Sequence, residues 1–225
     1  MNHIELGRLF GIPIYLDGMF VLVLLLFCYP YFTSGDTQLM SAGVIIIAGL
    51  MLSILLHELG HALAARLLKI SVSHIELTAL GGAAHFERSL PASVPIRTVV
   101  FLAGPAVNFA LWLGFNALAG QTAVATSGRL AMALGALAMA NFWLACFNLL
   151  PAFPLDGGRT LDTWLSRLFG STWSIRIVSG LGFLIAAWLA LLSFPNNYWQ
   201  LFLAFFLFQS NWLALQSVGG WRRGK

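Results

Sequence analysis

Long apolar runs separated by short polar stretches dominate the pattern of this chain. A helix needs about 20 apolar residues to cross the hydrocarbon core of a bilayer. By this measure the pattern predicts an all-α polytopic membrane protein with six transmembrane helices and a single domain over residues 1–225. The predicted spans are residues 17–32, 41–68, 98–119, 130–150, 175–194 and 198–216, of which the first is short.

The composition agrees with this class of protein. Hydrophobic residues make up 59% of the chain and charged residues only 9%, whereas soluble domains carry about 25% charged residues. The basic residues form no long run, so the sequence lacks the basic patch typical of nucleic-acid-binding proteins. We therefore expect a lipid bilayer, and no nucleic acid, as the partner. The sequence leaves the oligomeric state open.

The distribution of basic residues predicts the orientation. If the N-terminus is cytoplasmic and the chain crosses six times, only Arg129 of the 12 Lys and Arg residues lies outside. Cytoplasmic loops of membrane proteins are enriched in Lys and Arg. We therefore expect both termini in the cytoplasm, and we expect the membrane to be a prokaryotic plasma membrane.

Two segments alternate between apolar and other residues, as strands do. In residues 10–17, Ile12 and Ile14 flank Pro13, which favours an edge strand because proline cannot donate a ladder hydrogen bond. Residues 70–89 are β-branched at the start and then glycine-rich, which predicts a strand or hairpin. We expect both segments near the cytoplasmic side, where they can pair into a small β element.

Three ionisable residues interrupt the second predicted span. His57, Glu58 and His61 form the pattern H-E-x-x-H. Positions i and i+4 share one face of a helix, so both imidazoles can bind one Zn²⁺, and Glu58 is placed to act as a general base. Ionisable groups inside a membrane helix are costly and are functional by default. The pattern therefore predicts a catalytic metal site rather than packing.

Two histidines leave a catalytic zinc site one protein ligand short. The best remaining candidate is Asp156 in "NLLPAFPLDGGR", residues 148–159, just after the fourth predicted span. The prolines of this segment end the helix, and its glycines permit tight backbone geometry. The second and fourth spans both run towards the cytoplasm in the predicted topology. Asp156 is therefore expected on the same side of the membrane as His57.

These motifs resemble the site-2 protease family, intramembrane zinc metalloproteases of peptidase family M50. "HELGH" resembles the zinc-binding helix of the family, and "NLLPAFPLDGGR" resembles its second motif. Further resemblances are "FGIPIYLD" at residues 10–17, "LGG" at 80–82 and "GPAVN" at 104–108. The resemblance covers the chain from about residue 9 to residue 160. The last two predicted spans carry no matching motif.

The resemblance implies an enzyme for regulated intramembrane proteolysis. One Zn²⁺ would be held by His57, His61 and Asp156, and Glu58 would take a proton from the attacking water and pass it to the leaving amine. The implied partner is another membrane protein, cut in or beside a transmembrane segment. A strand from the glycine-rich loop could pair with the unwound substrate. Asn148, Gly81 and Gly82 are the expected substrate-binding residues of this sequence.

Other functions remain open from the sequence. A metal-ion transporter also places His and Asp in membrane helices, but it should repeat these residues in several helices along a transport path across the membrane. A protease-like scaffold that binds without cutting is a further alternative. Asn108 is interpreted as structural, His74 and His85 as loop residues, and an oxyanion role of His85 as a minor alternative.

Overall fold

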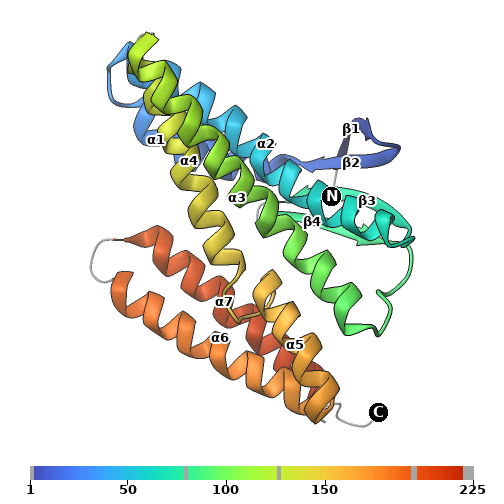
Figure 1. The fold of residues 1–225 in the computed structure, drawn as a ribbon. Coiled ribbons are helices and arrows are strands. Elements are labelled where there is room, and N and C mark those ends of the chain that lie inside the picture. Colours follow the sequence, from blue (N-terminus) through green and yellow to red (C-terminus); the bar gives the residue numbers. More distant parts are fainter. Residues whose placement is uncertain (1–2, 79–80, 126–127, 194–196, 220–225) are drawn as a thin grey trace. The chain divides into compact units, whose positions relative to one another are not determined.

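The computed structural model describes residues 3–78, 81–125, 128–193 and 197–219. These residues form seven helices and four strands (Figure 1). The chain divides into two compact units: unit 1 comprises residues 1–91 and 103–146, and unit 2 comprises residues 92–102 and 147–225. The basic tail Arg222, Arg223 and Lys225 lies outside the described residues, as do Leu80 and part of the turn after residue 193.

Most elements up to residue 146 belong to unit 1. In chain order they are β1 (His3–Leu9), β2 (Ile12–Asp17), α1 (Gly18–Phe32), α2 (Thr37–Leu67), β3 (Val72–Thr78), β4 (Gly81–Phe86), α3 (Val94–Ala125) and α4 (Gly128–Asn148). Unit 2 contains α5 (Asp156–Phe169), α6 (Ser171–Ser193) and α7 (Tyr198–Val218), together with the first residues of α3 and the end of α4.

The strands form one sheet in the order β1-β2-β3-β4. β2 pairs in parallel with β3, with Ile14 opposite Ile75, whereas β1–β2 and β3–β4 are antiparallel. The two segments predicted to be strands do pair, but the prediction that residues 10–17 form an edge strand is wrong, because β1 covers β2. Pro13 is tolerated in this inner strand since pairing with β3 begins only at Ile14.

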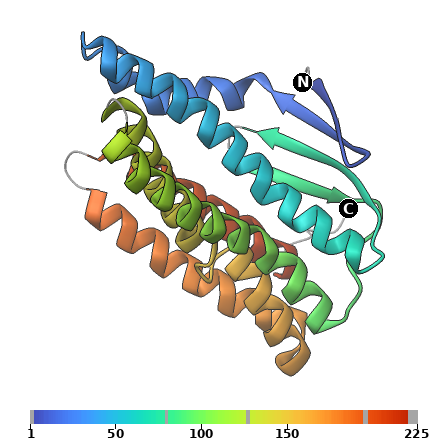
Figure 2. The ribbon, with the colours of Figure 1, turned by 45° about the horizontal axis from the view of Figure 1, so that its top comes forward.

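The apolar face of the sheet lies against α2 (Figure 2). Ile12 and Leu16 of β2 and Ile75 of β3 are buried in one cluster with Leu59 and Ala62 of α2. Successive residues of a strand point to opposite faces. The other face of β3 and β4 therefore carries the polar residues of these strands.

Unit 2 is helical. α6 and α7 pack along each other, and α5 packs against α6 (Figure 1). α5 was not predicted: its 14 residues are too polar for a membrane span. It lies between the fourth and fifth predicted spans and carries Arg159 and Arg167.

Five described helices are long and apolar enough to cross a membrane, namely α2, α3, α4, α6 and α7. Their bounds lie within a few residues of the predicted spans. α1 coincides with the predicted first span, but its 15 residues leave it outside this group. The fold is thus mostly helical with a small four-stranded sheet.

Candidate active site

The H-E-x-x-H residues lie in the C-terminal half of α2. His57, Glu58 and His61 are 5%, 6% and 6% exposed. Buried polar groups are stable only when they are hydrogen-bonded, paired or bound to a metal. Within unit 1, the neighbouring side chains of α3 and the backbone of β4 determine the orientation of His57 and the space around Glu58 and His61.

The two imidazoles face each other through the same ring atom. His57 Nε2 lies 3.1 Å from His61 Nε2, and the ring planes are nearly perpendicular, at 82°. Two nitrogens that each lie about 2.0–2.1 Å from a tetrahedral zinc are about 3.3 Å apart. The spacing of this pair therefore fits two ligands of one metal ion.

Asn108 on α3 fixes the tautomer of His57. Its Oδ1 lies 2.5 Å from His57 Nδ1, and because an amide oxygen only accepts, Nδ1 is the donor. Nε2 of a neutral His57 then carries the lone pair and points at His61. Metal-binding histidines typically donate their second ring N–H to such an acceptor.

A series of buried hydrogen bonds holds the Asn108 side chain in place. Asn108 Nδ2 donates to Asn141 Oδ1, and Asn141 Nδ2 donates to Ser53 Oγ, each at 2.9 Å. Ser53 Oγ donates to the carbonyl of Gly49 at 2.7 Å. Asn108 and Asn141 are both fully buried. These hydrogen bonds therefore determine which end of the Asn108 amide faces His57.

Gly104 leaves space at the two facing nitrogens. A Cβ at this position of α3 would lie 2.3 Å from His61 Nε2 and 2.6 Å from His57 Nε2. Any side chain would therefore occupy the place where both lone pairs converge. The donor set and this space together fit a bound metal ion.

Two glycines of β4 have different reasons to be glycine. Gly81 has a φ of 119°, a conformation that other residues rarely adopt, and its carbonyl accepts a hydrogen bond from Thr78 Oγ1. A Cβ at Gly82 would lie 2.3 Å from Glu58 Cγ and 2.7 Å from Glu58 Oε1. Gly82 thus lets the backbone of β4 approach the Glu58 side chain.

Asp156 belongs to unit 2, where it begins α5. It is 7% exposed, and the helix N-terminus favours its negative charge. A Cβ at Gly157 would lie 2.1 Å from the carbonyl oxygen of Leu149, and one at Gly158 would lie 2.4 Å from that of Ala152. The two glycines therefore let the first turn of α5 pack on the preceding segment. Asn148 is the last residue of α4 and is partly buried.

Asn211 of α7 holds the segment that precedes Asp156. Its Nδ2 donates to the carbonyl of Phe153 at 2.8 Å, and its Oδ1 accepts from the Phe153 N–H at 3.1 Å. A Cβ at Gly182 of α6 would lie 2.2 Å from Asn211 Oδ1, so this glycine makes room for the amide. The last two helices, which carry no recognised motif, thus support the Asp156 segment.

Sequence reasoning missed several supporting residues. Asn141, Asn211 and Ser53 are polar residues in predicted spans, which is a signal in itself because such residues need partners inside a membrane. Asn108 was interpreted as structural; the structure shows in addition that it accepts a hydrogen bond from His57 Nδ1. His85 projects from the face of β4 opposite the one on which Gly82 meets Glu58, so its position does not favour an oxyanion role.

Comparison with known proteins places these features in a family. Residues 45–123 and 114–192 match the sequence model of peptidase family M50. A putative zinc metalloprotease of Synechocystis is 32% identical over 93% of this chain and 59% of its own length. A zinc metalloprotease of Methanocaldococcus jannaschii is 32% identical over 81% of this chain and 51% of its own length.

A solved structure extends the match. The site-2 protease from Methanocaldococcus jannaschii superimposes with a TM-score of 0.70 at 25% identity, covering 100% of both chains. The chain spans about half to three-fifths of the length of the curated relatives. With five long apolar helices among its described residues, it is a multi-pass membrane protein.

Proposed function

Because this chain belongs to peptidase family M50, we propose that it is an intramembrane zinc metalloprotease of the site-2 type. It hydrolyses peptide bonds in or beside transmembrane segments of other membrane proteins. The observation that carries the proposal is the buried pair His57–His61, whose ring nitrogens face each other on the helix that also carries the buried Glu58. A metal-ion transporter would not need a buried general base next to its ligands.

The proposed metal ligands are His57, His61 and Asp156. Zinc at this position would polarise the scissile carbonyl and lower the pKa of a bound water to about 7. Two neutral imidazoles and one carboxylate are a common zinc ligand set, and they leave a fourth position for water. Asn108 keeps His57 in the tautomer that offers Nε2.

Glu58 is the proposed general base. Its carboxylate takes a proton from the attacking water and delivers it to the nitrogen of the leaving amine, so the peptide bond breaks and one water molecule is consumed. The side chain is buried, and the backbone of β4 closes one side of it at Gly82. This contact restricts the orientations that Glu58 can adopt.

The proposed substrate binds in extended form. A helix hides its carbonyl groups, so the segment to be cut must first unwind. β4 is at the edge of the sheet and can add a substrate strand through backbone hydrogen bonds. Gly81 and Gly82 lie at the end of β4 that reaches Glu58, which supports their proposed role in substrate binding. Asn148 is proposed as a further substrate contact.

The proposed topology has six crossings, with α1 as the first and both termini in the cytoplasm of a prokaryotic cell. The asymmetry of Lys and Arg residues supports it. The two units then act as one protease domain over residues 1–225. Cysteine substitutions in the α6–α7 turn and in the α4–α5 segment, tested with an impermeant thiol reagent, should label only the turn from outside the cell.

One experiment tests the proposed activity. Purified protein is reconstituted with a pool of transmembrane peptides, and mass spectrometry identifies the products. Glu58→Gln should lower cleavage by about 10²–10⁴-fold, the usual contribution of a general base, and should retain zinc. Glu87→Gln removes an exposed carboxylate just after β4 and should cleave like the wild type.

The two variants also separate the alternatives. Cleavage by Glu58→Gln at the wild-type rate would contradict the assignment of the general base. If the wild-type protein binds zinc and peptides but releases no products, the chain is a binding scaffold. Zinc flux into sealed vesicles without cleavage would identify a transporter.

A further inference from the structure

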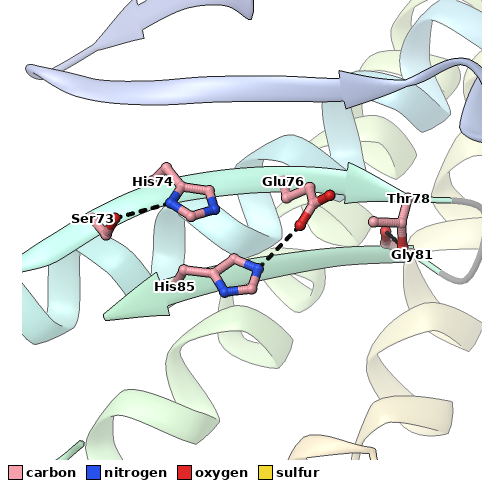
Figure 3. A network of polar contacts seen from close by, with 6 residues as sticks. All are labelled: Ser73, His74, Glu76, Thr78, Gly81 and His85. Carbon is pink, nitrogen blue, oxygen red and sulfur yellow. Dashed lines mark hydrogen bonds and ion pairs between the residues drawn. The ribbon is translucent and has the colours of Figure 1, made fainter. Parts of the chain in front are cut away.

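The polar face of β3 and β4 gathers three side chains of the kind that bind transition metals. His74 and Glu76 lie two residues apart on β3 and so share a face, and His85 of β4 is directly opposite His74 in the register. Figure 3 shows the two imidazoles and the carboxylate together over this pair of strands. None of them belongs to the H-E-x-x-H motif.

The distances bring these groups into one cluster. Each residue offers one ligand atom, and the three atoms all lie within 4.8 Å of one another. His85 Nε2 is 3.3 Å from Glu76 Oε2. The rings of His74 and His85 are stacked, with centroids 4.4 Å apart and planes at 11°. The result is a donor set of two imidazoles and one carboxylate.

The simplest reading of the cluster is an ion pair between Glu76 and His85. That pair alone explains neither the stacked position of His74 nor the local backbone. The register between β3 and β4 shifts between Val72 and His74, so that Ser73 is an extra residue at a bulge. Ser73 Oγ then lies 2.9 Å from His74 Nδ1. A hydroxyl in this position can accept the Nδ1 proton and leave Nε2 for a metal.

We propose that His74, Glu76 and His85 form a second metal site, which takes Zn²⁺ or another divalent first-row transition metal. Ligand atoms of a tetrahedral zinc lie about 3.3 Å apart, so the cluster must contract slightly. The His85 side chain is 45% exposed and Glu76 is 21% exposed, so small side-chain rotations at the surface can bring the ligand atoms closer together. The same exposure leaves water as a fourth ligand and makes the ion exchangeable.

Metal at this site would connect the two strands of the hairpin. β3 is tied to the core by Ile75 and Leu77, whereas β4 is the edge strand. The opposite face of β4 meets Glu58 at Gly82. If the proposed protease function is correct, an ion on the polar face therefore stiffens the strand that presents the substrate to the general base.

The test counts metal. Purified protein is dialysed against buffered excess Zn²⁺, and bound zinc is measured by mass spectrometry together with protein concentration. The wild type should hold one zinc more per chain than Glu76→Gln and one more than His85→Gln. Glu87→Gln removes the same charge from an exposed position after β4 and should hold as much as the wild type.

Hydrogen exchange adds a readout that a change in surface charge would not move. Zinc should slow exchange of the amides of residues 81–86 in the wild type and in Glu87→Gln, but not in Glu76→Gln. Equal zinc in the wild type and in both cluster variants would overturn the proposal, as would an equal loss in Glu87→Gln. The test compares the zinc bound per chain between variants, so its outcome does not depend on whether the H-E-x-x-H site also binds zinc.

Discussion

The His57–His61 pair and the His74–His85 pair belong to the same unit but are held in place differently. His57 and His61 are buried on one helix, and a chain of hydrogen bonds through Asn108, Asn141 and Ser53 fixes the first of them. His74 and His85 come from two strands. Their rings stack on each other, His85 pairs with Glu76, and Ser73 Oγ and the ring of Tyr15 contact His74.

This difference shows how one ligand type serves two purposes. A buried ligand cannot relax towards water, so its orientation must be set in advance by neighbours that are themselves fixed. A partly exposed ligand can rotate to meet an ion and release it again. We therefore expect tight, permanent binding at the helical pair and exchangeable binding at the strand pair. Substitutions around each pair should differ in the size of their effects.

Gly104→Ala should have the largest effect. Its Cβ would lie 2.3 Å from His61 Nε2, so the imidazoles must move apart and the shared metal position is lost. We expect loss of tightly bound zinc and of cleavage, together with about 1–3 kcal/mol lower stability from overpacking. Zinc content and thermal unfolding measure both effects.

Gly114→Ala is the matched control on the same helix. A Cβ there meets no atom within 4 Å, and alanine favours a helix over glycine by roughly 0.5–1 kcal/mol. It should keep zinc and unfold no more easily than the wild type. If Gly104→Ala retained zinc as well as this control does, the space at Gly104 would have no part in metal binding.

Asn108→Ala should have an intermediate effect. Removing the acceptor frees the His57 ring and its tautomer, and losing such a partner typically lowers metal affinity about 10–100-fold. Asn108→Asp keeps an oxygen opposite Nδ1 and should recover most of the affinity, although it loses the donor to Asn141. Zinc affinity is measured by competition with a chelator. Equal affinity in the Ala and Asp variants would show that Asn108 acts only in packing.

Ser73→Ala should have the smallest effect. It removes the hydroxyl next to His74 Nδ1, but water can reach this partly exposed ring and replace it. We expect the affinity of the strand site to fall about tenfold or less, the low end for a supporting hydrogen bond. Titration with Co²⁺, followed by its visible absorption, measures the change. A loss as large as that of Asn108→Ala would erase the contrast between the two pairs.

The sequence was sufficient wherever spacing alone decides which side chains meet. His57 and His61 are four residues apart on a helix, and the apolar runs placed the long helices within a few residues. The sequence was insufficient where the pairing of distant segments determines which side chains lie together. His74 meets His85 only through the β3–β4 register, and β2 became an inner strand only because residues 3–9 form β1.

The supporting polar residues illustrate the same limit. Asn141 and Asn211 stand in apolar helices, so the sequence indicates that each needs a partner. Which partner each finds depends on how the helices pack: Asn141 meets Asn108, and Asn211 meets the backbone of Phe153. The amphipathic helix α5 has only 14 residues and many polar side chains, so it lacks the long apolar run that predicts the other helices of unit 2.

X-ray absorption at the zinc edge tests the central claim, a metal held by the imidazoles of α2, most directly. The measurement uses His85→Gln protein loaded with one zinc per chain, so that the strand site does not contribute. The account predicts two imidazoles bound to zinc through nitrogens at about 2.0–2.1 Å, and loss of bound zinc when His61→Gln is added. An imidazole count that is the same with and without His61 would contradict it.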